Sequence, residues 1–294
     1  MMDILNRSIL FGGKAIVSAL DITETAKRAR EIHGFSVAAA RAFTKALTLA
    51  AFMSAGFKDL GNKLTVILYG DGAGGKMVFA GKEGAKVRGY MEHPDCLADR
   101  PDAKVSDVVG REGTLAVIKD FGLKEPYNGY SRLVNGSIDA DFAYYFTQSE
   151  QLPSAVATGV KFDENGEIVA AGGVIVQPMP GCTDEILVML EDIVRDFTDM
   201  DERVAKFSPQ QLIDDRFGHF EKSDLEPVYP AYECDCSRER TAAAIKLLGR
   251  AEAEKIIAEA GRIEVGCDFC GKKYVFDADD VRNIFDKDRN GKDS

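Results

Sequence analysis

Four cysteines near the C-terminus constrain this sequence more than any other feature. They form a C-x-C pair, Cys234 and Cys236, and a C-x-x-C pair, Cys267 and Cys270, with 30 residues between the pairs. A C-x-x-C turn places two thiolates on one side of a metal ion, and Gly271 permits the left-handed backbone that such a turn needs. Together the two pairs predict one tetrahedral, all-thiolate zinc site with one Zn²⁺ per chain.

The spacing leaves two roles open for such a site. A structural zinc site without any regulatory role is about as well supported as a redox switch. The C-x-C pair favours the switch, because a disulfide between cysteines two positions apart is strained. A module of about 60 residues has a marginal core of its own. Zinc contributes roughly 10–16 kcal/mol to folding in such modules, so oxidation of the ligands would unfold it.

Charge and hydropathy exclude several classes of protein. The chain of 294 residues has 48 acidic and 37 basic side chains, a net charge of −11, which disfavours nucleic acid as a partner. No apolar run is long enough to span a bilayer. The N-terminus lacks the pattern of a signal peptide. We therefore expect a cytoplasmic protein with no membrane partner, where the six cysteines indicate metal or redox chemistry rather than structural disulfides.

Residues 1–181 predict an α+β, β-rich core domain with flanking helices, because strands come in runs rather than in strict alternation with helices. We expect helices over 22–33, closed by Gly34, from Ser36 to about Gly56, and over 139–149. The expected strands cover residues 8–20, 64–70, 76–81, 85–91, 114–121, 155–162 and 167–177.

Residues 182–232 predict a helical linker. Between residues 183 and 233 there are 14 acidic and 5 basic side chains, a net charge of −9, and apolar residues recur at helical spacing. Ser208 and Gln211 are placed for a capping box that would begin the second of two helices. The segment is either an ordinary amphipathic pair docked on the core or a conditionally folded element, and it can be both.

Residues 233–294 predict a small zinc-binding α+β module. Ser237 would cap a helix through Leu248, and a second helix covers Arg250–Ala260. Strands at 263–265 and 273–276 would enclose the C-x-x-C turn, and Asp277 or Asp279 would open a final helix.

The other candidate motifs are weak. The run GDGAGG at 70–75 lacks the ending of a phosphate-binding loop, so a hairpin turn is the better interpretation. The three histidines, His33, His93 and His219, are scattered with no nucleophile motif near them. Cys96 and Cys182 have no close partner in sequence and are not expected to be ligands.

The segments CDCSRERTAAAIKLLG (234–249) and IEVGCDFCGKKYVFDADDV (263–281) resemble the zinc module of the 33-kDa heat-shock chaperone family, the redox-regulated bacterial chaperonins. The resemblance covers the whole chain, and its other motifs are VRGYMEHP (87–94), PYNG (126–129), YYFTQSEQLPSAV (144–156) and GGVIVQPMPG (172–181). It implies an ATP-independent holdase whose partners are unfolded client proteins.

The resemblance also implies how activity is controlled. It carries the zinc ligands over onto Cys234, Cys236, Cys267 and Cys270, and it implies Cys234–Cys236 and Cys267–Cys270 disulfides in an oxidised, zinc-free, active form. The reduced protein would be a monomer and the oxidised protein a homodimer. We expect oxidation to unfold the zinc module, the linker to detach by self-repulsion, and an apolar patch to open for clients.

Two other classes of function remain as alternatives. A zinc-ribbon module that recognises nucleic acid or a protein would be favoured by a basic face, and the acidic charge argues against it. A metal-dependent enzyme needs an open coordination position, and four thiolates leave none. We therefore expect no catalytic residues.

Overall fold

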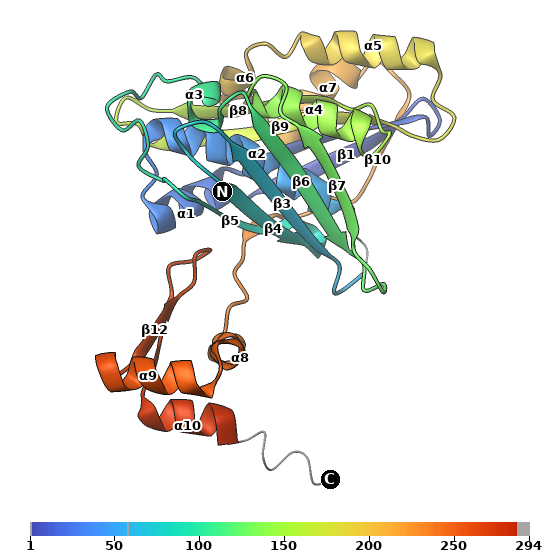
Figure 1. Ribbon diagram of the computed structural model, residues 1–294. Coiled ribbons are helices and arrows are strands. Elements are labelled where there is room, and N and C mark those ends of the chain that lie inside the picture. Colours follow the sequence, from blue (N-terminus) through green and yellow to red (C-terminus); the bar gives the residue numbers. More distant parts are fainter. Residues whose placement is uncertain (1, 58, 287–294) are drawn as a thin grey trace. The chain divides into compact units, whose positions relative to one another are not determined.

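The computed structural model describes residues 2–57 and 59–286. The chain divides into two compact units, Met1–Glu233 and Cys234–Ser294. The first unit contains two mainly antiparallel sheets with helices between and outside them, and the second contains helices around a hairpin (Figure 1). The predicted α+β class is therefore confirmed.

The first sheet has five strands in the order β10-β1-β2-β9-β8. Their bounds are β1 (Ile4–Leu10), β2 (Ala15–Asp21), β8 (Ala155–Phe162), β9 (Ile168–Pro178) and β10 (Lys222–Asp224). Strand β8 lies at one edge of this sheet.

The second sheet has six strands in the order β11-β5-β4-β3-β6-β7. Their bounds are β3 (Lys63–Gly70), β4 (Met77–Lys82), β5 (Lys86–Met91), β6 (Gly113–Asp120), β7 (Tyr127–Arg132) and β11 (Ala231–Tyr232). A short 3₁₀ turn, Glu83–Ala85, joins β4 to β5. Only β11, which pairs with β5, runs parallel to its neighbour.

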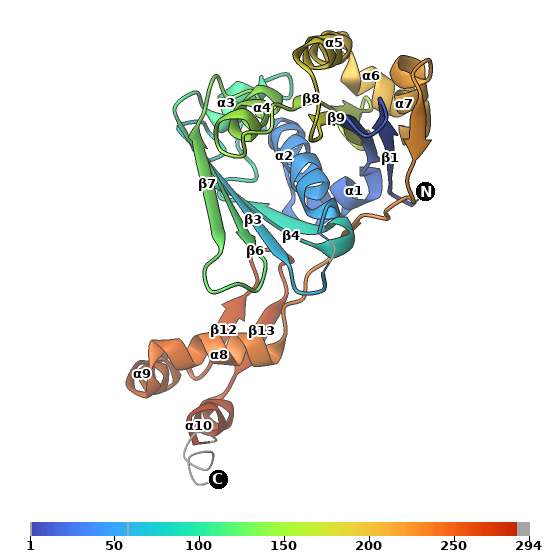
Figure 2. The same ribbon diagram turned by 90° about the vertical axis from the view of Figure 1, so that its right-hand side faces the viewer.

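Helix α2 (Val37–Ala55) lies between the two sheets and contacts strands of both, as Figure 2 shows. Its alanines are buried, and such small side chains let the sheets approach the helix closely. Ser36 caps its first turn by accepting a hydrogen bond from Ala39 N–H at 3.1 Å. The preceding helix, α1 (Thr23–His33), ends at Gly34 in the left-handed conformation, as predicted.

Two further helices of the first unit are α3 (Val105–Val109) and α4 (Ile138–Gln148), and both contribute apolar side chains to its larger core. Asp141 of α4 is fully buried, and its Oδ1 accepts hydrogen bonds from Val134 N–H at 2.8 Å and Asn135 N–H at 3.3 Å. The carboxylate therefore fixes the loop that leads into α4.

The acidic segment forms three helices on the other face of the five-stranded sheet: α5 (Asp184–Arg195), α6 (Met200–Lys206) and α7 (Pro209–Phe217). Their apolar side chains share one buried cluster with β1, β2, β8 and β9. The predicted capping box is present, with Gln211 N–H donating to Ser208 Oγ and Ser208 N–H donating to Gln211 Oε1.

Helix α6 packs so closely on β8 at Gly159 that no residue with a side chain would fit at this position. A Cβ atom at Gly159 would lie 2.5 Å from the backbone C and O atoms of Met200. Glycine is therefore required here for close packing of the helix on the strand.

Two sequence expectations about the first unit are wrong. Residues 8–20 are not one strand, because Gly12 and Gly13 take positive φ angles and turn the chain between β1 and β2. The acidic segment has three helices instead of two. Sequence analysis also missed α3, β7, β10 and β11, which are short or depend on pairing with distant strands.

The second unit contains α8 (Arg238–Leu248), α9 (Arg250–Ala260), the hairpin β12 (Ile263–Gly266) and β13 (Lys273–Phe276), and α10 (Ala278–Asp286). The Ser237 cap is present, and Asp277 Oδ1 accepts hydrogen bonds from the N–H groups of Asp279 and Asp280. Residues 287–294 of the predicted zinc module lie outside the described residues.

Candidate metal centre

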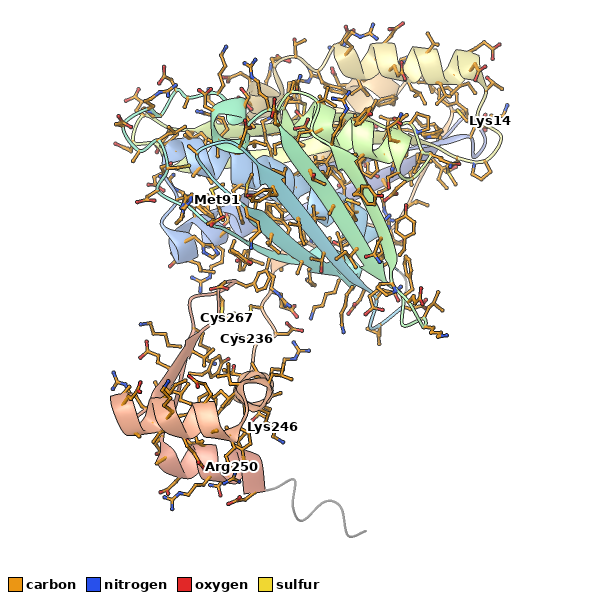
Figure 3. The ribbon with its side chains drawn as sticks, in the orientation of Figure 1. Lys14, Met91, Cys236, Lys246, Arg250 and Cys267 are labelled. Carbon is orange, nitrogen blue, oxygen red and sulfur yellow. The ribbon has the colours of Figure 1, made fainter. Side chains whose placement is uncertain are left out.

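The four predicted ligands come from two short segments of the second unit. Cys234 and Cys236 precede α8, and Cys267 and Cys270 lie in the turn between β12 and β13. Figure 3 shows Cys236 and Cys267, one from each segment, next to each other. The fold thus brings together the two cysteine pairs that are 30 residues apart in the sequence.

The hairpin turn holds its two cysteines through backbone hydrogen bonds. The N–H groups of Cys270 and Gly271 both donate to the Cys267 carbonyl, at 3.2 and 2.8 Å. Gly271 has a φ of +70°, in the left-handed region that the sequence predicts for it. This geometry points both thiols of the C-x-x-C pair toward one side of the turn.

The four sulfur atoms fit one tetrahedral metal ion. All four Sγ atoms lie within 4.8 Å of one another. The Cys234–Cys267 and Cys236–Cys270 sulfurs are 3.7 and 3.4 Å apart. A tetrahedron with Zn–S bonds of about 2.3 Å has an edge of roughly 3.8 Å, so these spacings match four thiolates around one ion.

No other cluster in the described residues is suited to a metal. Within residues 2–57 and 59–286, these four cysteines are the only group of three or more His, Cys, Asp or Glu side chains placed to share an ion. Cys96 is half buried against the core of the first unit, and burial raises the pKa of its thiol. Cys182 is likewise not a member of the cluster.

The second unit has a small core beside the cysteine cluster. Its buried apolar residues are Ile245, Ala253, Ile263, Tyr274, Phe276 and Val281. Cys236 packs against this core. Six buried side chains are few for a folded unit of this length, and such units usually need a metal or disulfides for stability.

Tyr274 of β13 connects the core to the cysteines. Its hydroxyl donates to Cys236 Sγ at 3.2 Å. Burial raises the pKa of Cys236, but hydrogen bonds from Tyr274 and the neighbouring thiols outweigh burial and lower it to about 7. Burial raises the pKa of Cys234 and of Cys270. Cys236 therefore loses its proton more readily than Cys234 or Cys270.

Among the four basic residues near the ligands in sequence, Arg240 has a raised pKa, mainly because of Asp235 and to a smaller extent because of Cys234 and Cys236. Arg238 instead pairs with Asp280, and Lys273 pairs with Glu264. Lys272 lies over the ring of Tyr274 at 5.2 Å.

The GDGAGG run forms the hairpin connection between β3 and β4, as predicted. The N–H groups of Gly72, Ala73 and Gly74 donate to carbonyl groups of α3. These amides are occupied by the fold, so the loop has none of them left to bind a phosphate.

No helix in the described part of the chain combines the length and apolar character needed to cross a membrane. This finding agrees with the apolar runs in the sequence, which are all short.

Comparison with known proteins identifies the family. Residues 3–277 match the family described as Hsp33 protein. A 33 kDa chaperonin of Thermoanaerobacter sp. (strain X514) is 36% identical over 288 residues, which cover 97% of this chain and 98% of the relative. A 33 kDa chaperonin of Clostridioides difficile (strain 630) is 35% identical over 288 residues, 97% of this chain and 99% of the relative.

A solved structure shows the same fold over nearly the whole chain. The crystal structure of the 33 kDa chaperonin from Thermotoga maritima superposes with a TM-score of 0.87 at 28% identity, covering 98% of this chain and 99% of that one. The relatives are named as chaperonins and not as enzymes. The chain therefore belongs to the Hsp33 family, and the protein is a chaperone.

Proposed function

We propose that this protein is a redox-regulated, ATP-independent holdase that binds unfolding proteins under oxidative stress. The observation that carries the proposal is the cluster of four Sγ atoms within 4.8 Å of one another. Thiols are the side chains that peroxide-type oxidants attack most readily, so a chaperone stabilised by four of them can respond to oxidation.

In the reduced form, Cys234, Cys236, Cys267 and Cys270 would hold one Zn²⁺. The ion would supply folding free energy rather than catalysis, because four thiolates leave no open position. Structural zinc contributes roughly 10–16 kcal/mol. Typical net stabilities are about 5–15 kcal/mol. The small core of the second unit would therefore not remain folded once its thiolates are oxidised.

Oxidation would join Cys234 to Cys236 and Cys267 to Cys270. Each disulfide would form as two thiolates lose two electrons to the oxidant and give up their bonds to zinc, and a peroxide would take up these electrons with two protons from the solvent and be reduced to water. In the folded cluster, the thiols placed to hydrogen-bond to each other come from different motifs, Cys234 with Cys267 and Cys236 with Cys270. Disulfides within each motif thus require the cluster to open, which couples oxidation to unfolding of the module.

Clients would bind where the acidic helices now pack. Helices α5, α6 and α7 cover an apolar face that β1, β2, β8 and β9 contribute. Their segment has a net charge of −9 over residues 183–233, so its self-repulsion favours release once the neighbouring module unfolds. The uncovered face and the apolar sides of the helices would form a contiguous surface for unfolded chains.

The remaining features of the proposal follow from the same switch. The active form would be a homodimer and the reduced form a monomer, both in the cytoplasm, where thiols are kept reduced until stress. Neither nucleic acid nor a membrane is a proposed partner, given the charge of −11.

Suppression of thermal aggregation tests the function. The reduced protein and a peroxide-treated sample are each added to a denaturing client without ATP. We expect suppression only by the oxidised sample. Full suppression by the reduced, metal-loaded protein, or an absolute need for ATP, would contradict the proposal. Metal analysis of the reduced protein should give one zinc per chain, lost in Cys234→Ser and kept in Cys96→Ser.

A further inference from the structure

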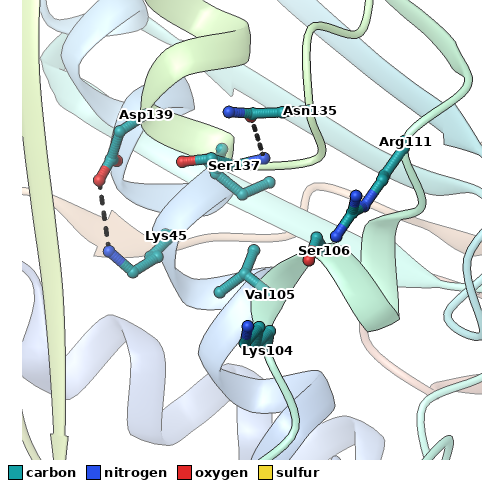
Figure 4. Close-up of a pocket in the computed structure, with 9 residues that line it drawn as sticks. Lys45, Lys104, Val105, Ser106, Arg111, Asn135, Ser137 and Asp139 are labelled. Carbon is teal, nitrogen blue, oxygen red and sulfur yellow. Dashed lines mark hydrogen bonds and ion pairs between the residues drawn. The ribbon is translucent and has the colours of Figure 1, made fainter.

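A cavity of about 480 Å³ in the first unit has a positively charged wall, although the chain as a whole has a charge of −11. Three cations line it: Lys45 from α2, Lys104 directly before α3, and Arg111 directly after the turn that ends α3. Asp139 of α4 is the one carboxylate among the lining residues (Figure 4). The lining side chains therefore have an excess of two positive charges.

Lys45 and Asp139 neutralise each other within the wall. Their Nζ and Oδ2 atoms are 3.4 Å apart. Both also bind Thr158, Lys45 by donating to its carbonyl and Asp139 by accepting from its N–H and hydroxyl groups. This pair is occupied by the fold and forms one side of the cavity.

Lys104 and Arg111 are exposed to solvent and are the two charges of the wall without a protein counter-ion in the described part of the chain. Within residues 2–57 and 59–286, neither side chain has an ion pair or a hydrogen bond. The backbone at Arg111 is nevertheless fixed, because Asp71 Oδ1 accepts hydrogen bonds from the N–H groups of Arg111 and Glu112 at 2.7 and 3.0 Å. The guanidinium thus extends from a rigid position into a space where no protein anion meets it.

Neutral hydrogen-bond donors lie on the same wall. Ser106 and Ser137 each contribute a hydroxyl. Ser137 is the N-cap residue of α4, but its side chain does not cap the helix. The first-turn N–H groups of this 11-residue helix are further donors, while Asp139 and Asp141 in the same turn offset the positive end of its dipole. Gly136, where a Cβ would lie 1.9 Å from the Gly110 carbonyl oxygen, packs this loop tightly against the one that bears Arg111.

We propose that this cavity is a binding site for a phosphate-type oxyanion. Two unpaired cations match a dianion, whereas a carboxylate would leave one of them uncompensated. Guanidinium, ammonium and hydroxyl groups are the donors that bind tetrahedral phosphoryl oxygens. No aromatic ring lines the wall, so a nucleobase has nothing to stack on. The site is independent of the cysteine switch.

Calorimetric titration of the reduced, full-length chain with inorganic phosphate tests the site. We expect saturable 1:1 binding that weakens at least about tenfold in the double variant Lys104→Ala/Arg111→Ala, because both charge-assisted contacts are lost. The matched control is Lys14→Ala/Lys124→Ala, which removes the same charge from two exposed positions that do not line the cavity. This control should bind phosphate as the unmodified chain does.

Three further probes identify the ligand. The affinity for glycerol 3-phosphate is compared with the affinity for inorganic phosphate. Tighter binding of glycerol 3-phosphate indicates that the ligand is a phosphate ester, and tighter binding of inorganic phosphate indicates the free ion. AMP should bind no more tightly than inorganic phosphate, and acetate should bind at least about tenfold more weakly. Backbone amide shifts of Ile138 and Asp139 on phosphate addition should follow the same titration. Equal phosphate affinity in both double variants, or acetate binding as tight as phosphate, would overturn the proposal.

Discussion

Asp201 of α6 accepts a hydrogen bond at Oδ1 from the backbone N–H of Val160, with 2.9 Å between the two atoms. Val160 lies in β8, an edge strand of the five-stranded sheet, where every second backbone N–H faces away from the neighbouring strand. A side chain of the acidic segment thereby satisfies a donor of the core. This hydrogen bond fixes the position of α6 along β8, whereas apolar packing alone would allow the helix to shift.

The Asp201→Ala variant should loosen this docking. It leaves the Val160 N–H without its acceptor, and hydrogen bonds to charged groups contribute about 1.5–3 kcal/mol, so the free energy of unfolding should fall by about that amount. Urea unfolding measures the change, and faster amide exchange at Val160 locates it. Glu202→Ala is the control, since its ion pair with Lys161 is exposed and should contribute less than about 1 kcal/mol. Equal losses in the two variants would refute a special role for Asp201.

Gly159→Ala should lift α6 from β8, because the added Cβ would lie 2.5 Å from Met200 backbone atoms. We expect a loss of about 1–3 kcal/mol and more rapid proteolysis within residues 184–217 of the reduced protein. Gly56→Ala serves as the control, because its Cβ would have only one neighbour, at 3.9 Å. Unchanged proteolysis in Gly159→Ala would show that the close approach does not hold the helix.

Two aspartates should contribute to the pH dependence of the free energy of unfolding in opposite directions. Burial raises the pKa of Asp141 above its ordinary 3.8, despite hydrogen bonds from three backbone N–H groups. An acid with a raised pKa binds its proton more tightly when folded, so the wild type should gain stability relative to Asp141→Asn as the pH falls from 7 to about 4.

Asp71 provides the comparison. The N–H groups of Glu112 and Arg111 lower its pKa. An acid with a lowered pKa stabilises the fold above its unfolded pKa and loses that contribution as the pH falls. The wild type should therefore lose stability relative to Asp71→Asn over the acid range, the reverse of Asp141. Thermal unfolding of the three proteins at several pH values measures both signs, and parallel pH profiles would contradict the assignment.

Tyr274→Phe should weaken metal binding without removing a ligand. The hydroxyl that donates to Cys236 Sγ is lost, and removal of such supporting contacts typically lowers metal affinity about 10–100-fold. Competition with a chromogenic chelator measures the change. Tyr130→Phe, the same substitution at an exposed residue of the first unit, should have no effect. If both variants bind zinc equally, Tyr274 only packs the core.

The order of oxidation gives the fifth prediction. Cys267–Cys270 should close first, because a turn allows acceptable disulfide geometry, whereas Cys234–Cys236 demands a strained ring. The second disulfide should wait for the upstream segment to loosen, and heat should accelerate it more than the first. Timed alkylation with mass-spectrometric mapping at two temperatures measures both. Closure of Cys234–Cys236 first would exclude this coupling.

The sequence predicts the clustering of the four cysteines better than it predicts the details of the core. The cysteine spacing is a local signal with one dominant chemical meaning, and Gly271 takes the backbone conformation expected of it. Helices with strong caps, such as those begun by Ser36 and Ser208, are also found at their predicted positions.

Features that depend on distant contacts were not predictable. Strand β11 is two residues long and exists because Ala231 and Tyr232 pair with β5, more than 140 residues earlier. The hydrogen bond from Tyr274 to Cys236 follows from the hairpin register, which the spacing of cysteines does not set. The cationic cavity collects residues from α2, from both ends of α3 and from α4, and only the tertiary fold brings them together.

The contact between Gly159 and α6 also bears on how related sequences can diverge. The atoms of Met200 that a Cβ at Gly159 would meet belong to the backbone. No exchange of side chain at position 200 can make room for a larger residue at position 159, so substitutions at the two positions cannot compensate for each other. This close contact should therefore leave no signal of paired substitution among homologous chains, and the constraint should fall on the glycine alone while the residue at position 200 varies.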